Sequence, residues 1–295
     1  MWHRACGLAK RADAAQGPGM HGFRRHVLAC NNARLPGRRL TFRIGGDVVG
    51  YVTAELARAL TFWPQHIHFD GGGLSIRGGR HAAALQGIAQ DLSERGYFRW
   101  RDEAFDVRAH PGGPVLARID RGALPAFGIL AEGVHLNGLV RRAEGVHLWV
   151  GRRAPHKTLD PDKLDHIVAG GVPAGLTPVE TLAKEGDEEA GLPAELAVRA
   201  EKVGEIGYAM EREEGLRRDL LHCFDLWLPE DFTPHPNDHE VVAFELWPLA
   251  RVHDAVRDTD MFKFNVNLVL IDLFIRQGLI VGTEAEWLRQ ALNAE

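Results

Sequence analysis

The segment that decides the fold reads Gly170-Gly171-Val172-Pro173-Ala174-Gly175-Leu176-Thr177-Pro178-Val179-Glu180-Thr181-Leu182-Ala183-Lys184-Glu185-Gly186-Asp187-Glu188-Glu189-Ala190-Gly191-Leu192. Its second half predicts a helix over residues 178–190, because Thr177 can cap the first turn and Gly191 can end the last. Pro178 suits the first helical turn. A predicted strand over residues 166–169 precedes the glycine pair. The segment is therefore expected to run from strand to loop to helix.

Three glutamates of this helix, Glu185, Glu188 and Glu189, are spaced at i, i+3 and i+4. That spacing places their carboxylates on one helix face, where like charges repel. Taken alone, such an acidic run is more often a solvated face. The upstream glycine pair favours a metal site, because glycine lets backbone approach closely. The expected cation is Mg²⁺, with Mn²⁺ as a substitute, since Mg²⁺ bridges carboxylates and substrate phosphates.

The segment resembles the Nudix box, in which a glycine and a spaced glutamate precede Arg-Glu, an aliphatic residue, any residue, Glu-Glu, any residue and Gly. Gly170 matches the opening glycine, and Gly191-Leu192 matches the close. The three glutamates match the metal-binding carboxylates. The resemblance implies a hydrolase that cleaves a diphosphate, with Glu185, Glu188 and Glu189 as both catalytic and metal-binding residues.

Three positions depart from the box. Leu176 replaces its first glutamate, Lys184 its arginine and Gly186 its aliphatic residue. In the family the first glutamate and the arginine support each other, so their joint change leaves the metal ligands intact. Gly186 costs about 1 kcal/mol of helix stability relative to alanine, and the sequence offers no reason for this cost.

Further segments resemble one branch of the family, the Nudix part of fungal thiamin pyrophosphokinase-related proteins. The segments are Phe127-Gly128-Ile129, residues 133–138, Arg152-Arg153, Leu164-Asp165-His166, residues 168–171 and Phe262-Lys263-Phe264-Asn265. Members of that branch carry an additional N-terminal domain of similar size, so the resemblance covers nearly the whole chain from Phe23. It implies thiamin diphosphate, or its oxo and oxy forms, as the substrate, with the monophosphate as product.

Basic residues beside the box are candidates for substrate binding. Arg152, Arg153 and Lys157 follow a predicted strand. Arginine can bind phosphate through two hydrogen bonds and lysine as a point charge, although such residues can equally face water. Gly170 and Gly171 complete this set, since their backbone can approach a substrate.

Polar and aromatic residues elsewhere in the sequence are further candidates for the same pocket. Asn137 and His135 alternate on a predicted strand and so share one face, where they either line a pocket or pack inside. A carboxylate from the loop of Asp238 and Glu240 could position water, although a solvated loop is more common. The rings of Phe262, Phe264 and Trp247 are expected to face the ring system of a thiamin compound.

Composition limits the classes of protein. Among 295 residues, 45% are hydrophobic and 25% charged, as in a soluble globular protein. The net charge of −5 argues against a nucleic-acid partner, and no apolar run approaches the roughly 18 residues of a membrane span. Cys6, Cys30 and Cys223 are scattered, which favours a reducing cytoplasm. We therefore expect a small-molecule diphosphate as partner, no nucleic acid, no membrane, and a possible homodimer.

The chain is expected to have an α/β fold, a Nudix-type α/β/α sandwich with a mixed sheet after a smaller α+β domain. Residues 1–20 are read as a disordered tail or upstream extension, 21–118 as the N-terminal α+β accessory domain, and 119–295 as the Nudix hydrolase domain. Predicted strands are 39–44, 48–52, 127–130, 134–141, 146–152, 203–209, 216–228 and 240–246, with turns at 132–133 and 144–145. Further helices are predicted over 80–94, 266–276 and 284–292.

Two alternatives remain open at this level. One is a Nudix hydrolase for another substrate, such as a nucleoside diphosphate sugar, a dinucleotide or a coenzyme A derivative. The other is a binding or regulatory protein that keeps the fold without turnover. The altered Leu176 and Lys184 motivate the second alternative, and the three intact glutamates argue against it.

Overall fold

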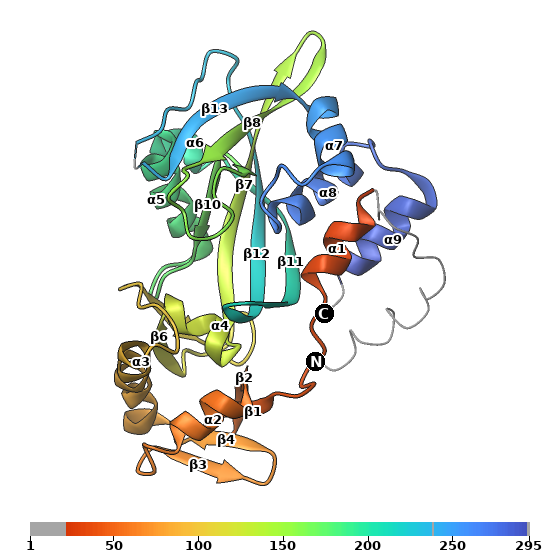
Figure 1. Cartoon of the computed structure of the whole chain (residues 1–295). Coiled ribbons are helices and arrows are strands. Elements are labelled where there is room, and N and C mark those ends of the chain that lie inside the picture. Colours follow the sequence, from red (N-terminus) through yellow and green to blue (C-terminus); the bar gives the residue numbers. More distant parts are fainter. Residues whose placement is uncertain (1–21, 238, 294–295) are drawn as a thin grey trace.

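The protein, described by a computed structural model over residues 22–237 and 239–293, consists of a larger and a smaller part (Figure 1). The larger part contains a seven-stranded sheet, and the smaller part a four-stranded sheet and a two-stranded ribbon. The expected α/β/α sandwich with a mixed sheet, preceded by a smaller α+β part, is confirmed. The expected tail over residues 1–20 lies outside the described residues, as does Asp238, and the domain boundary at residue 118 stays a prediction.

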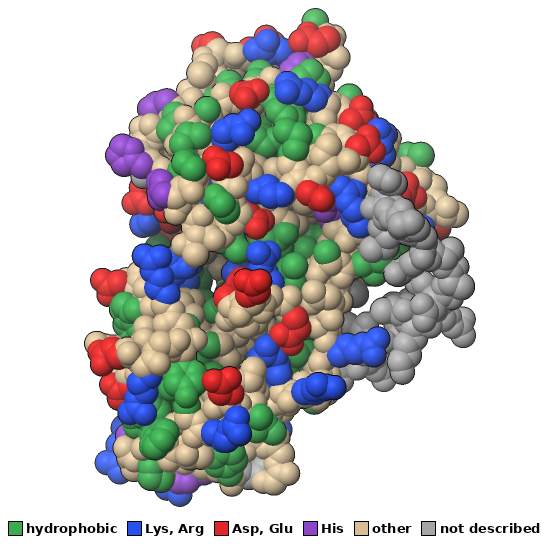
Figure 2. All heavy atoms as spheres, in the orientation of Figure 1, with side chains coloured by type: hydrophobic (Ala, Val, Ile, Leu, Met, Phe, Trp, Pro, Cys, Tyr) green, Lys and Arg blue, Asp and Glu red, His purple; other side chains and the backbone are tan. Residues whose placement is uncertain are grey.

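The surface of both parts carries charges of both signs. Figure 2 shows acidic and basic side chains interspersed over one face, and the molecule is narrower where the two parts meet. Within the described ranges, none of the helices combines the length and the apolar character that a membrane crossing requires.

The strands of the large sheet run in the order β11, β12, β7, β8, β13, with β10 beside β7 and β9 beside β8. β7 and β12 pair in parallel, and the other neighbours are antiparallel. The bounds are β7 Leu130–Arg142, β8 Gly145–Arg153, β9 Leu164–Asp165, β10 Val168–Gly171, β11 Glu201–Arg212, β12 Gly215–Trp227 and β13 Val241–Pro248. Antiparallel pairing of β10 with β7 places Gly170 opposite Val134, and this register brings the glycine pair to the site.

Helices cover both faces of this sheet. On one face, α5 (Pro178–Ala190) and the short α6 (Ala194–Ala197) pack against apolar side chains of the central strands. On the other face lie α7 (Leu249–Asp258), α8 (Val266–Arg276) and α9 (Gly282–Leu292). Both faces of the sheet are therefore covered by helices, and the polar residues on one face are separate from those on the other.

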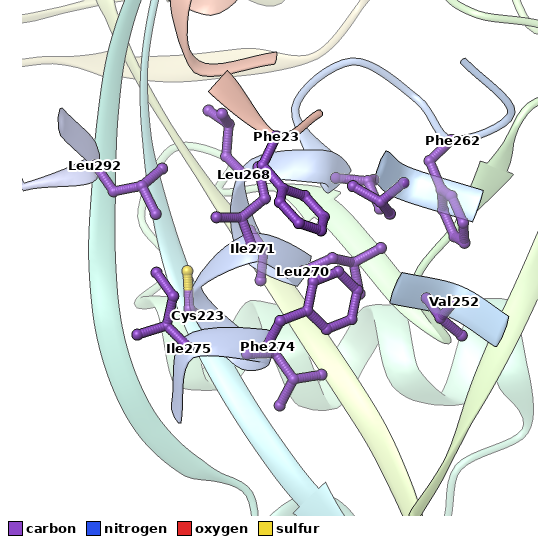
Figure 3. Close-up of a cluster of buried hydrophobic side chains, with 14 of the residues drawn as sticks. Phe23, Cys223, Val252, Phe262, Leu268, Leu270, Ile271, Phe274, Ile275 and Leu292 are labelled. Carbon is purple, nitrogen blue, oxygen red and sulfur yellow. The ribbon is translucent and has the colours of Figure 1, made fainter. Parts of the chain in front are cut away.

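The helix α8 forms the centre of the second layer, and almost all of its residues are buried (Figure 3). The first described helix, α1 (Arg24–Cys30), joins this layer although it lies far away in the sequence. Phe23 packs near Phe274, with ring centroids 6.0 Å apart. Each such buried apolar side chain contributes about 1.5–3 kcal/mol, so α1 is an integral part of the larger core.

The smaller part has its own hydrophobic core. Its hairpin of β1 and β2 turns at Gly45 and Gly46, which both have positive φ, as the twist of a tight hairpin requires. The elements are β1 Leu40–Ile44, β2 Asp47–Val52, α2 Ala54–Leu60, β3 Ile67–Asp70, β4 Gly73–Ile76, η3 Gly79–Ala84, α3 Leu85–Glu94, β5 Ala104–Val107, β6 Ala117–Asp120, η4 Arg121–Ala123 and α4 Leu124–Phe127. The ribbon of β5 and β6 lies next to the larger part.

Several predicted elements differ from the structure. The strand expected at 127–130 is wrong, because α4 ends at Gly128 with φ +57° and β7 begins at Leu130. The turn expected at 132–133 is also wrong, since those residues pair within β7 with β12. The helix expected at 80–94 begins as the 3₁₀ helix η3. The glycine pair lies inside β10 and not after it, because β7 offers these residues a pairing partner.

The helix α5 begins and ends at the predicted residues. Thr177 accepts a hydrogen bond from the N–H of Glu180, whose carboxylate accepts one from the N–H of Thr177. Gly191 ends the helix with φ +59°. The structure also explains Gly186, because a Cβ there would lie 3.2 Å from Leu192, which returns against the helix and donates its N–H to the Gly186 carbonyl.

The capping of α5 leads to a stability prediction. Replacing Thr177 by alanine removes the side-chain acceptor and is expected to lower the free energy of unfolding by about 1 kcal/mol. Urea denaturation followed by circular dichroism measures the difference. Val179→Ala, an exposed change in the same first turn, is the matched control. An equal effect of both substitutions would contradict the assigned role of the cap.

Candidate functional site

The helix α5 presents its three glutamates to different surroundings. The Glu189 side chain is buried, and its Oε2 accepts a hydrogen bond of 2.9 Å from the N–H of Ala169 in β10. Glu185 is largely covered, whereas Glu188 is about half exposed. Lys184 forms ion pairs with both Glu185 and Glu188. The lysine that replaces the arginine of the box thus holds two of the three carboxylates directly.

The glycine pair of β10 leaves room on both sides of the strand. A Cβ at Gly170 would lie 2.7 Å from the carboxyl carbon of Glu185, so only glycine lets this carboxylate reach the strand. A Cβ at Gly171 would lie 2.6 Å from the ring of Phe105 in β5. Gly170 and Gly171 are thereby brought together with the helix carboxylates, as the sequence predicts, and with one residue of the smaller part that it does not.

A small cavity of about 10 Å³ lies at Glu189. Its lining comes from the ends of several strands and from α5, and comprises Arg153, Asp165, His166, Ala169, Glu189, Glu240 and Val241. The volume is close to that of one water molecule. Glu240, considered above as a loop acid, is therefore next to Glu189, and it forms an ion pair with Lys157.

Negative charge is concentrated around this cavity. Burial raises the pKa of Glu189 well above its ordinary value, and the neighbouring Asp165, Glu185 and Glu240 raise it further, although the hydrogen bond from Ala169 opposes this. Burial also raises the pKa of Glu185, against the effect of Lys184. Crowded carboxylate oxygens beside an open backbone are the donor set that a hard divalent cation prefers. The residues present thus fit Mg²⁺ or Mn²⁺.

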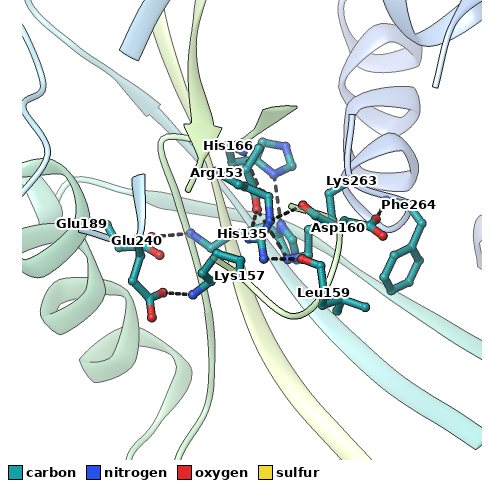
Figure 4. Close-up of polar contacts among 12 residues, drawn as sticks. His135, Arg153, Lys157, Leu159, Asp160, His166, Glu189, Glu240, Lys263 and Phe264 are labelled. Carbon is teal, nitrogen blue, oxygen red and sulfur yellow. Dashed lines mark hydrogen bonds and ion pairs between the residues drawn. The ribbon is translucent and has the colours of Figure 1, made fainter. Parts of the chain in front are cut away.

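Two of the predicted basic residues already have partners within the protein (Figure 4). The guanidinium of Arg153 donates to the carbonyls of Asp160 and Leu159 and to the carboxylate of Asp165, over 2.8–3.1 Å. Lys157 is paired with Glu240. Arg152 is half-buried on β8. Arg153 is thus built into the structure beside the cavity, and its contact with a phosphate stays a prediction.

Asn137 lies on the opposite side of the sheet from α5. Its side-chain N–H donates to Asp225 over 2.8 Å, and Asp225 is paired with Arg276 of α8. The structure therefore does not bring Asn137 together with the helix carboxylates. Its proposed contact with a substrate remains a prediction without geometric support.

The expected aromatic pocket is wrong. Trp247 and Phe262 are core residues with ring centroids 6.4 Å apart. Phe264 is covered by the guanidinium of Arg212, which lies 4.7 Å from its ring centroid, and by Tyr208. These rings pack against the hydrophobic core of the larger part, and none of them lines the cavity at Glu189.

A buried polar cluster, which the sequence did not predict as a unit, lies at the cavity. Asp165 binds Arg153 over 2.8 Å and lies 3.5 Å from Lys263. The Nδ1 atoms of His135 and His166 are 3.0 Å apart. Burial lowers the pKa of His166 to about 4 and that of His135 well below its ordinary value, which favours the neutral form of both rings. Charged residues inside apolar runs, such as Lys263 between two phenylalanines, are the sequence signal for such a cluster.

Among the described residues, His135, Asp165 and His166 also have their ligand atoms within 4.8 Å of one another, as metal ligands would. The charge of Asp165 is already balanced, however, by Arg153 and Lys263. Burial alone would raise the pKa of Asp165, and these two cations lower it instead. A divalent cation would have to displace both, so we interpret the cluster as an internal support for the cavity wall.

A family model described as a NUDIX domain matches residues 133–267, and a domain of unknown function (DUF4743) matches residues 22–131. Nudix hydrolase 24, chloroplastic, of Arabidopsis thaliana is 36% identical over 268 residues, which cover 88% of this chain and 73% of that protein. Nudix hydrolase 20, chloroplastic, of the same plant is 34% identical over 275 residues, with 88% and 74% covered. A solved MutT protein from Methanosarcina mazei Go1 aligns over 50% of this chain and 95% of that chain, with 16% identity and a TM-score of 0.39.

The buried cluster leads to a prediction about stability and pH. Asp165→Asn leaves Arg153 and Lys263 without their carboxylate and is expected to lower the free energy of unfolding by about 3–5 kcal/mol. The lowered pKa of Asp165 lies below its unfolded value of about 4. Its contribution is therefore fully present above that value and is lost as pH falls through the folded pKa.

Denaturation of wild type and variant at a series of pH values tests this. The difference between them should be constant from about pH 5 to pH 8 and shrink below about pH 4. Glu230→Gln, an exposed neutralisation elsewhere in the larger part, should leave stability nearly unchanged. A pH-independent difference would show that the charge of Asp165 is not what stabilises the cluster.

Proposed function

This chain belongs to the Nudix hydrolase family and is a hydrolase for diphosphate compounds, and we propose that it acts with Mg²⁺ on thiamin diphosphate or on its oxo and oxy forms. The products would be the monophosphate and inorganic phosphate. The centre would be the face of α5 that carries Glu185, Glu188 and Glu189, next to the backbone of β10.

One observation carries the assignment of this centre. Glu185 approaches Gly170 so closely that no side chain fits between them, and Glu189 reaches the neighbouring Ala169 N–H from one helical turn further on. Burial of the Glu185 and Glu189 carboxylates beside the end of β10 costs free energy unless a cation or a proton neutralises them. This cost supports a catalytic arrangement over a solvated acidic face.

Each residue of this centre would have a separate role in hydrolysis. Glu185, Glu188 and Glu189 would hold the cation, which when bound neutralises diphosphate oxygens and lowers the pKa of a bound water. Lys184 keeps Glu185 and Glu188 in place. Glu240 lines the cavity of Glu189 and can accept the proton of the attacking water. A bond from the water oxygen to phosphorus forms, and the bridging P–O bond breaks to release a phosphate.

The substrate proposal rests on the resemblance of sequence segments to the thiamin-related branch. The core positions of Trp247 and Phe262 remove the aromatic argument for it. A nucleoside diphosphate compound is therefore the alternative substrate, and a protein that binds without turnover is the alternative function. A panel of compounds separates these possibilities.

A first prediction concerns the carboxylates. Glu188→Gln and Glu189→Gln keep side-chain size and remove charge, so kcat with Mg²⁺ is expected to fall about 100-fold or more, close to 3 kcal/mol. The melting temperature should stay the same or rise slightly, because like-charge repulsion is relieved. Asp187→Asn, exposed on the same helix, is the matched control. Wild-type turnover in both glutamine variants would exclude this centre, and Mn²⁺ should be visible between these side chains in a soaked crystal.

A second prediction concerns the substrate. Thiamin diphosphate, its oxo and oxy forms, ADP-ribose and a nucleoside triphosphate are assayed side by side, with Mg²⁺ and with a chelator. We expect a thiamin compound to have the highest kcat/KM, and the chelator to abolish turnover. If a nucleotide is hydrolysed faster than every thiamin compound, the substrate proposal is wrong. If nothing is hydrolysed while Mg²⁺-dependent binding persists, a binding protein is indicated.

A further inference from the structure

The smaller part of the protein reaches the loop that follows β10. The N–H of Ala174 donates to the carbonyl of Ala104 in β5 over 2.7 Å, and the N–H of Gly175 donates to Asp106 over 3.4 Å. Phe105, between these two, packs against Gly171. The loop between the glycine pair and α5 is therefore held by β5, and the residues at the start of β5 lie beside the centre.

A buried aspartate holds this corner of the smaller part. Asp120 is fully buried, and its carboxylate accepts hydrogen bonds from the N–H groups of Arg101, Glu103 and Gly122, over 2.8–3.1 Å. The N–H of Arg121 also donates to the carbonyl of Glu103 over 2.7 Å. The backbone at this end of the ribbon is thus fixed where the chain enters β5 and leaves β6, and Arg101 and Arg121 both belong to this fixed backbone.

These two arginines face the larger part. Arg101 donates to Thr158 over 3.4 Å, in the loop that carries Lys157. Arg121 pairs with Glu103 over 2.8 Å, and its guanidinium lies 5.9 Å from the ring centroid of Phe105. Arg121 is also among the cations, with Lys157 and Arg153, that hold the pKa of Glu240 below its ordinary value although burial raises it. Arg101 thus contacts the loop that carries Lys157, and Arg121 lies beside Phe105, whose ring packs at Gly171.

The guanidinium of Arg101 lies near other cations, and an anion bound there would offset their repulsion. The pKa of Arg101 is lowered by burial and by the neighbouring Arg99 and Arg121. Arg121 is paired with Glu103, and Arg153, Lys157 and Lys184 of the larger part are likewise each paired with a carboxylate, so Arg101 is the member of this set whose guanidinium donates to a hydroxyl. A metal ion held by carboxylates neutralises only part of the charge of a diphosphate. The other phosphate needs cationic groups, and arginine matches the geometry of a phosphate.

We propose that Arg101 and Arg121 of the smaller part bind one phosphate of the diphosphate substrate, so that the diphosphate is held between the two parts of the chain. This assignment rests on the proposed function of the centre on α5. Glu103 limits the strength of the contact, because it pairs with Arg121 when no phosphate is bound. The smaller part is then a component of the substrate site, and Arg101 and Arg121 determine the affinity for phosphate.

The test uses the full chain with Mg²⁺ and methylenediphosphonate, a diphosphate analogue whose bridging carbon prevents hydrolysis. Isothermal calorimetry gives Kd for wild type, Arg101→Ala, Arg121→Ala and Arg121→Lys. Each alanine variant is expected to bind about tenfold more weakly, the loss of one charge-assisted hydrogen bond, and Arg121→Lys should lie between. Arg58→Ala, an exposed arginine on α2, is the matched control and should bind as wild type.

Glu103→Gln is expected to strengthen binding of the analogue, the opposite of the effect of the alanine variants. A merely structural role of the arginines would not produce such a gain. Freed from its partner, Arg121 should bind the analogue more tightly than in wild type, and Arg121→Ala should cancel that gain in the double variant. For a hydrolysed substrate, the alanine variants should lower kcat/KM about tenfold, since the phosphate that these guanidinium groups bind adjoins the reacting bond.

The outcomes separate this inference from the proposed function. Arginine-dependent binding of the analogue without hydrolysis of any compound would support the arginine site and reject the hydrolytic substrate proposal. Wild-type affinity in Arg101→Ala and Arg121→Ala, at unchanged melting temperature, would overturn the inference. Absence of analogue binding to the wild-type protein would overturn it as well.

Discussion

Close packing around Gly170 and Gly171 is the constraint on which the site depends. One glycine leaves space for the Glu185 carboxylate, and the other leaves space for the ring of Phe105. An alanine at either position would force a carboxylate or an aromatic ring out of place, because interiors are close-packed. The same two residues thus set the distance of α5 from β10 and the position of the smaller part. The position of Glu185 and the contact between the two parts are thus coupled at this strand.

A second level of support comes from buried charge. Asp165 is flanked by Arg153 and Lys263, which come from different elements, so the pairing connects β8, β9 and the segment before α8. Such pairs stabilise little in total, but removal of one member is costly because it leaves an unpaired charge. The cluster therefore fixes the wall of the cavity next to Glu189. In the smaller part, Asp120 has a comparable role towards Arg101 and Glu103.

Residues from distant regions of the chain meet at the cavity, where α5 provides Glu189 and the residue before β13 adds Glu240. The proposed phosphate site would add Arg101 and Arg121, which flank the ribbon of β5 and β6. The local segment with the glutamates was recognisable because its spacing is helical and its caps are explicit. The contribution of the ribbon was not, since Arg101 and Arg121 occur in no motif and their role depends on the backbone bonds of Asp120.

The sequence by itself determined the family, the mixed α/β class, the ends of α5 and α8, and the helix face that the three glutamates share. The family follows from the resemblance of residues 170–192 to the Nudix box, and the helix ends follow from local rules, namely capping and periodicity. Tertiary structure alone decided that Arg153 is committed to Asp165, that Asn137 lies across the sheet, and that Trp247 and Phe262 belong to the core. It also extended β7 through the expected turn at residues 132–133. Burial and long-range pairing decide these features, and both depend on which distant segments become neighbours when the chain folds.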